Sequence, residues 1–117
     1  MHERITEITS PDGALRFLVE RDTRGEWFFG FEGYTSRTLI DVVMIACHGS
    51  PEETAKHYTE GLTSDRLVIA ILQEDGRAID AWIEESPESL LWPPEVSGTT
   101  ILLRYWSGAL YVPLLMR

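Results

Sequence analysis

The strongest constraint on the fold is the alternation of apolar and polar residues in the first third of the chain. Leu15, Phe17 and Val19 alternate with Arg16 and Glu20, which is the pattern of a half-buried strand. The tetrapeptide SPDG at 10–13 places Pro and Gly where a tight turn prefers them. Strands are therefore predicted over residues 3–9, 14–22 and 27–32, and together they form an antiparallel β-meander.

The second clear signal is a helix whose two ends are both marked. Ser50 can cap the helix, Pro51 suits its first position, and Glu53 can close a capping box. The helix is expected to run to about residue 60, where Gly61 ends it. The side chains expected to face the core along this helix are those of Ala55, Tyr58 and Leu62.

The segment before this helix, residues 38–47, leaves two alternatives open. Its apolar positions fit helical spacing and Thr38 could cap a helix, whereas four β-branched residues within 40–45 favour a buried strand. The helix is slightly favoured, with Gly49 as its end.

The second half of the chain reads as strands joined by short turns. Six consecutive apolar residues at 67–72 predict a central strand covered on both faces. An Asp-Gly hairpin turn at 75–76 leads to a partner strand, and three prolines predict an irregular connection after it. A final hairpin follows, whose last strand carries Pro113 and is expected at an edge. The predicted ranges are 66–73, 77–85, 99–106 and 109–115 for the strands and 86–97 for the connection.

These elements predict a single α+β domain over residues 1–117. We expect a mostly antiparallel sheet of six to seven strands, with one or two helices inserted after the third strand and packed on one face. A single cysteine, Cys47, excludes an intramolecular disulfide and favours a reducing compartment. The sequence has neither an apolar signal core nor a run of the roughly 18 apolar residues of a membrane span, so a cytoplasmic location without membrane contact is expected.

Charge is distributed unevenly along the chain. The net charge is −9, and residues 74–95 hold seven acidic residues and one base, which leaves −6 in that segment. Nucleic acid is not expected as a direct ligand, because binding to phosphates draws on clustered Lys and Arg. The same segment contains Trp82 and Trp92, and aromatic side chains beside carboxylates are suited to gripping a basic partner.

A binding face follows from the side-chain alternation of the strand 77–85. Asp80, Trp82 and Glu84 point to one side of this strand, away from its apolar positions. If the strand 99–106 is its neighbour, Arg104 and Trp106 join this face and the two Trp form one aromatic patch. The alternative is structural: Arg104 pairs with one of the carboxylates, and both Trp lie under a helix or loop.

Other candidate residues carry weaker signals. Cys47 and His48 are adjacent, but a catalytic thiol and its base normally meet across a fold, so no catalytic residue is assigned. The histidine spacing fits no metal site, and no cofactor is expected. A ligand pocket between helix and sheet remains possible, with Tyr34, Arg37, His48 and His57 as its candidates.

The sequence therefore favours a non-enzymatic, acidic interaction protein of bacterial type that binds a basic protein partner through the Trp82-centred face. By analogy of class alone, it suits an antitoxin- or immunity-like inhibitor. Two alternatives stay open. The first is a small-molecule-binding domain or enzyme with a pocket between helix and sheet, and the second is a homodimer that uses the aromatic face.

Overall fold

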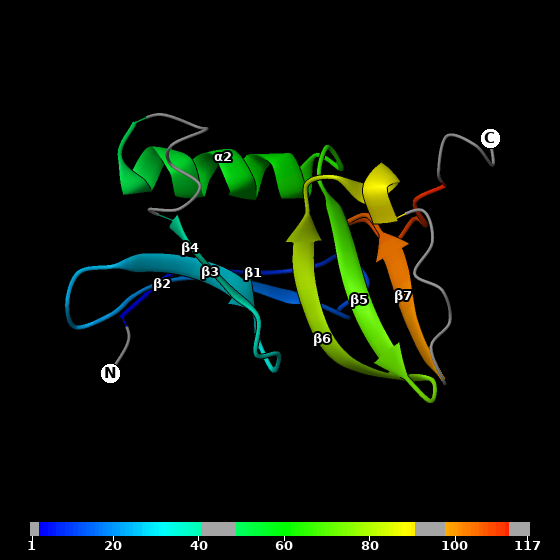
Figure 1. Ribbon diagram of the computed structural model, residues 1–117. Coiled ribbons are helices and arrows are strands. Elements are labelled where there is room, and N and C mark those ends of the chain that lie inside the picture. Colours follow the sequence, from blue (N-terminus) through cyan, green and yellow to red (C-terminus); the bar gives the residue numbers. More distant parts are fainter. Residues whose placement is uncertain (1–2, 41–48, 91–97, 113–117) are drawn as a thin grey trace.

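The computed structural model describes residues 3–40, 49–90 and 98–112 (Figure 1). Its elements form an α+β fold with two antiparallel sheets of four and three strands, where the sequence predicts one sheet of six to seven. The elements in chain order are β1 (Glu3–Thr9), β2 (Arg16–Arg21), β3 (Trp27–Phe31), β4 (Arg37–Leu39), α2 (Pro51–Thr63), β5 (Val68–Glu74), β6 (Arg77–Glu84), the 3-10 helix η1 (Pro87–Leu90) and β7 (Thr99–Arg104).

The first sheet has the order β1-β2-β3-β4, which confirms the predicted meander and adds a fourth strand. The amide of Gly13 donates to the carbonyl of Ser10 at 2.9 Å and closes the predicted turn before β2. Phe17 pairs with Phe31 across β2 and β3, and both rings are buried on the same face. Thr38 and Leu39 belong to β4, while residues 41–47 of the helix-or-strand segment lie outside the described residues.

The second sheet has the order β6-β5-β7, so the predicted central strand is indeed central. Asp75 and Gly76 both have positive φ angles, 51° and 80°, as the two-residue turn between β5 and β6 requires. Beyond β7, the described residues show one isolated bridge, from Arg104 to Leu110, where the sequence predicts a full hairpin. The predicted edge position of Pro113 falls outside the described residues.

The helix α2 begins as predicted and ends later. Ser50 caps it by accepting a hydrogen bond from the amide of Glu53 at 3.2 Å. It continues past Gly61 to Thr63. Gly61 lies inside the helix and makes room for Leu67, because an added Cβ would lie 2.9 Å from the Leu67 side chain. Within the described ranges, α2 is the one α-helix, and it follows the fourth strand instead of the third. No described helix has the length and apolarity needed to cross a membrane.

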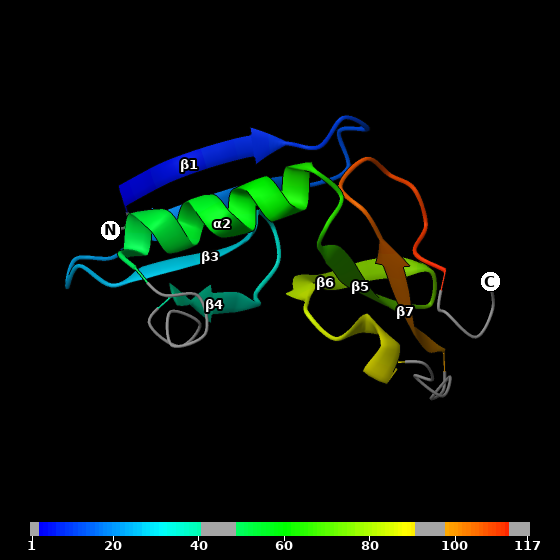
Figure 2. The ribbon, with the colours of Figure 1, turned by 90° about the horizontal axis from the view of Figure 1, so that it is seen from above.

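The helix lies over one face of the first sheet and reaches toward the second, as the two ribbon views show (Figures 1 and 2). A single buried cluster joins the three parts, with Phe17 from the first sheet, Leu62 from α2 and Ile69 from the second sheet all fully enclosed. The predicted stripe of α2 is confirmed, since Ala55, Tyr58 and Leu62 are buried. Burial of apolar surface between these layers is what holds the two sheets against one helix.

Candidate functional site

The predicted acidic–aromatic face is divided by the sheet order. β5 lies between β6 and β7, so the condition for a shared patch of Trp82 and Trp106 is not met. Ala70 of β5 pairs with both Trp82 and Leu103, which places these three side chains on one face. Arg104 is the next residue along β7 and lies on the opposite, core-facing side. Trp106 is only 5% exposed and belongs to the core.

Arg104 is bound inside the fold to a carboxylate from the other sheet. Its guanidinium lies 2.8 Å from the Asp12 carboxylate and also donates to the carbonyls of Tyr105 and Trp106. Only 6% of Arg104 is exposed. Hydrogen bonds from Arg104, from the Ser10 hydroxyl and from the Ala14 amide hold the pKa of Asp12 well below its usual range. This ion pair fastens the β1–β2 turn to the end of β7.

Asp80 forms a second link between the sheets. Its carboxylate accepts the amide of Ser36 at 3.1 Å, the hydroxyl of the same residue and the amide of Ala81 at 2.9 Å. Partial burial raises the pKa of Asp80, but these hydrogen bonds and the charge of Arg37 outweigh it and lower the pKa overall. The carboxylate thus holds the loop that enters β4 against β6.

Trp82 and Glu84 of the predicted face are half-buried and contact each other. The indole nitrogen of Trp82 lies 3.4 Å from one carboxylate oxygen of Glu84, and the amide of Ser86 donates to the other at 3.2 Å. Of the predicted face, these two residues remain at the surface of the sheet, whereas Asp80 has an internal partner.

The alternative pocket residues do not gather around one cavity. Arg37 folds back over Gly30 and donates to the carbonyls of Phe31, Tyr34 and Ser36. An added Cβ at Gly30 would lie 2.7 Å from the Arg37 side chain, so this glycine makes room for an arginine. Tyr34 packs half-buried against the core, His57 is exposed on α2, and His48 lies outside the described residues.

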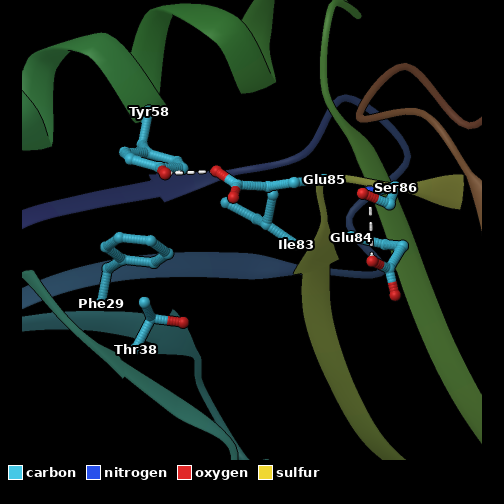
Figure 3. A pocket seen from close by; sticks show the side chains of 7 residues that line it. All are labelled: Phe29, Thr38, Tyr58, Ile83, Glu84, Glu85 and Ser86. Carbon is cyan, nitrogen blue, oxygen red and sulfur yellow. Dashed lines mark hydrogen bonds between the residues drawn. The ribbon is translucent and has the colours of Figure 1, made fainter. Parts of the chain in front are cut away.

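A cavity does lie where α2 meets both sheets (Figure 3). Its volume is about 290 Å³. One side comes from β3 and β4, the second from α2, and the third from the end of β6 and the residues after it. The lining side chains are those of Phe29, Thr38, Tyr58, Ile83, Glu84, Glu85 and Ser86.

The walls of this cavity combine aromatic rings with one inward carboxylate. The rings of Phe29 and Tyr58 have centroids 4.7 Å apart and are tilted by 34°. Both residues are 3% exposed, so they form a fixed floor. The Tyr58 hydroxyl donates to Oε1 of Glu85, and Figure 3 shows the Glu85 side chain reaching toward Tyr58 while that of Glu84 points away.

Pairing of charges differs between this cavity and the first sheet. Every acidic residue from Glu3 to Glu32 lies within 4.0 Å of an arginine. Among the residues that the structure describes, no such ion pair includes Glu74, Asp75, Glu84 or Glu85. The cavity therefore opens beside carboxylates that have no internal counter-ion in this part of the chain.

Sequence reasoning did not find Phe29, Thr38 or Glu85 as site residues. Each had a sufficient local explanation, because Phe29 continues an apolar strand face and Glu85 ends a strand. Their convergence depends on how the second sheet docks against the first, and no sequence spacing encodes that docking. A weak signal was available in Tyr58, whose hydroxyl on the core-facing stripe of a helix needs a polar partner.

Comparison with known proteins does not assign this site. No family model matches the chain, and it has no match among curated proteins or solved structures. Within the described ranges, no three His, Cys, Asp or Glu side chains are grouped so that they could hold a metal ion. The geometry of the cavity and its charges are what bear on function.

Proposed function

We propose that this protein is a non-enzymatic interaction protein that binds a basic protein partner at the acidic rim of the cavity. The rim is defined as Glu84 and Glu85, at the end of β6. The observation that carries the proposal is the contrast in charge pairing: the rim carboxylates have no ion pair among the described residues, whereas those of the first sheet have arginines beside them. A basic partner would supply the counter-charges that the fold itself does not place there.

Electrostatic physics supports this role for an acidic surface. Unneutralised charges of one sign raise the rate of association with an oppositely charged partner and fix its orientation. An aromatic floor beside the charges adds a desolvated contact, which is where binding energy concentrates in interfaces. The proposed contact is the rim and not the Trp82-centred face, because the Asp80 carboxylate accepts a hydrogen bond from Ser36 and Trp106 lies in the core.

The composition of the cavity favours binding over catalysis. Nucleophilic catalysis needs a base within hydrogen-bond reach of the nucleophile. The described lining residues include no His, Lys or Cys, and the hydroxyl within reach of the Glu85 carboxylate belongs to Tyr58, a core side chain that is only 3% exposed. A small-molecule-binding domain is the second candidate, since a volume of about 290 Å³ is close to the lower limit for ligand pockets.

Affinity capture from a lysate of the source organism, followed by titration calorimetry with the purified captured protein, tests the proposal. The rim variant E84Q/E85Q removes two charges at the cavity. The matched control E74Q/D75N removes two charges at the opposite end of the β5–β6 hairpin, and Asn tolerates the positive φ at position 75.

A basic protein retained by the wild type and the control but lost by the rim variant supports the proposal. Its association should also slow at high ionic strength. An equal loss of the retained protein in both variants would indicate that binding depends on the net charge of the chain and not on the rim. Retention by the rim variant would contradict the rim as the contact.

A further inference from the structure

We infer that the cavity receives a single lysine side chain of the basic partner, with its ammonium group beside Glu85. This inference rests on the proposed function and names the group that the partner inserts. It follows from three features of the cavity: the half-occupied carboxylate of Glu85, the aromatic and aliphatic walls, and the hydroxyl of Thr38.

The carboxylate geometry distinguishes lysine from arginine. Oε1 of Glu85 accepts the Tyr58 hydroxyl, and Oε2 has no hydrogen bond among the described residues. Arginine binds carboxylates best with two parallel hydrogen bonds to both oxygens, so it would have to share Oε1 with the Tyr58 hydroxyl. An ammonium is a compact charge that needs one oxygen and can direct its other protons elsewhere. Glu85 as it stands is therefore the better partner for lysine.

The walls suit the two parts of a lysine side chain. The rings of Phe29 and Tyr58 pack on each other at the floor and supply apolar surface beside the site of the ammonium. Ile83 provides an aliphatic wall for the methylene stem, which lysine readily buries while its charge stays near polar groups.

Thr38 offers a second acceptor from the opposite wall. It pairs with Phe29 across β3 and β4, so its side chain shares the core-facing side of the first sheet. Figure 3 shows its hydroxyl directed away from Phe29, toward the side of the cavity formed by β6. Within the described part of the chain this hydroxyl has no hydrogen bond, and an inserted ammonium could donate to it.

The experiment uses blocked pentapeptides that differ only in the central residue of Gly-Gly-Xaa-Gly-Gly, with lysine, arginine, acetyl-lysine or norleucine at that position. Each is titrated into the full protein while the methyl resonances of Ile83 and Thr38 are followed by NMR. Butylammonium is titrated as the free-amine probe. The variant E85Q tests the charge, because Gln keeps an oxygen for the Tyr58 hydroxyl. The matched control is E74Q, which removes one exposed charge at the opposite end of the β5–β6 hairpin, outside the proposed rim.

We expect saturable shifts of both methyl groups with the lysine peptide and weaker ones with the arginine peptide. E85Q should weaken lysine binding about ten- to a hundredfold, as expected for a hydrogen bond between charged groups, and E74Q should change it by less than about threefold. The acetyl-lysine and norleucine peptides should produce no saturable shift.

Equal shifts with the arginine or norleucine peptide would overturn the inference, as would equal losses in E85Q and E74Q. Tighter binding of butylammonium than of the lysine peptide would assign the cavity to a free amine and overturn the lysine assignment. If the rim variant loses its captured partner but the cavity methyl groups never respond, the proposed function stands and the lysine inference fails. If no basic protein is captured through the rim, the proposed function is contradicted, whatever the peptide titrations show.

Discussion

The first sheet and the β5–β6 hairpin both carry several carboxylates, but these differ in whether an arginine lies beside them. In the first sheet each acidic residue from Glu3 to Glu32 has an arginine within 4.0 Å. In the hairpin and the residue after it, the described carboxylates form no ion pair, and Glu84 and Glu85 border the cavity beside α2. Surface ion pairs contribute little to stability, so the arginines of the first sheet serve mainly to neutralise its charge. In the proposed function, a basic partner would neutralise the charge that the hairpin leaves unpaired.

Within each region, one carboxylate departs from the regional pattern. Asp12 pairs with a buried arginine, and Asp80 is held by hydrogen bonds from Ser36. Both connect one sheet to the other. The comparison therefore predicts that these two contribute to stability, that the exposed pairs hardly do, and that the rim contributes to binding.

Arg104→Ala should have the largest effect. The buried guanidinium contacts Asp12 and two carbonyl groups, and its removal leaves these acceptors without their donor. We expect a loss of about 2–4 kcal/mol in the free energy of unfolding, measured by urea denaturation. The control is Arg24→Ala, whose side chain is 76% exposed in its ion pairs and should cost less than about 0.5 kcal/mol. Similar losses in the two variants would contradict the distinction between buried and exposed pairs.

Asp80→Ala should have the next largest effect. It removes the acceptor for the amide and hydroxyl of Ser36 and should cost about 1–2 kcal/mol by the same denaturation measurement. Hydrogen exchange at the Ser36 amide should also become faster, because its acceptor is lost. An unchanged exchange rate would show that the loop before β4 is held by other contacts.

Acid should destabilise the protein through the same two residues. The pKa of Asp12 and that of Asp80 are both lowered in the folded state. Their stabilising contribution is therefore fully present above the unfolded-state pKa of about 3.9, and it is lost as the pH falls from there toward the lower folded-state values. Unfolding free energies measured across this range should fall less steeply for Asp12→Asn than for the wild type. Identical pH profiles would exclude Asp12 as a contributor.

Glu85→Gln should have the smallest effect on stability. Its side chain is exposed, and Gln can still accept the Tyr58 hydroxyl, so the melting temperature should change little, with a free-energy change within about 0.5 kcal/mol. A loss above about 1 kcal/mol would mean that Glu85 serves the fold, and the contrast between the two regions would then weaken.

Local features of the fold were predictable from the sequence because they depend on neighbouring residues. The meander follows from the alternation around Phe17, the start of α2 from the cap at Ser50, and the β5–β6 turn from Asp75 and Gly76. Tertiary packing changed one of these local predictions. Gly61 was predicted to end α2, but it lies inside the helix and makes room for Leu67. Glu84 of the proposed rim was predicted from the sequence as part of a binding face, although the cavity beside it was not predicted.

The alternation within β6 and β7 correctly separates their two faces but cannot say which strands are neighbours. Pairing of β7 with the far side of β5 moved Arg104 away from the carboxylates of β6 and toward Asp12, which lies 92 residues earlier in the chain. Contacts at such separation depend on how whole layers pack, and many pairings satisfy the same alternation.

The sequence by itself determined the strands of the meander, the capped helix, the hairpin turn and the concentration of acidic residues around β6. These are set by backbone propensity, side-chain periodicity and composition, each of which acts within a few residues. The tertiary structure alone decided that the strands divide into two sheets, that Asp12 and Asp80 join them, and that Glu85 faces Tyr58 across a cavity. The physical reason is that a carboxylate's role depends on which donors and charges the packing of distant layers brings within hydrogen-bond reach.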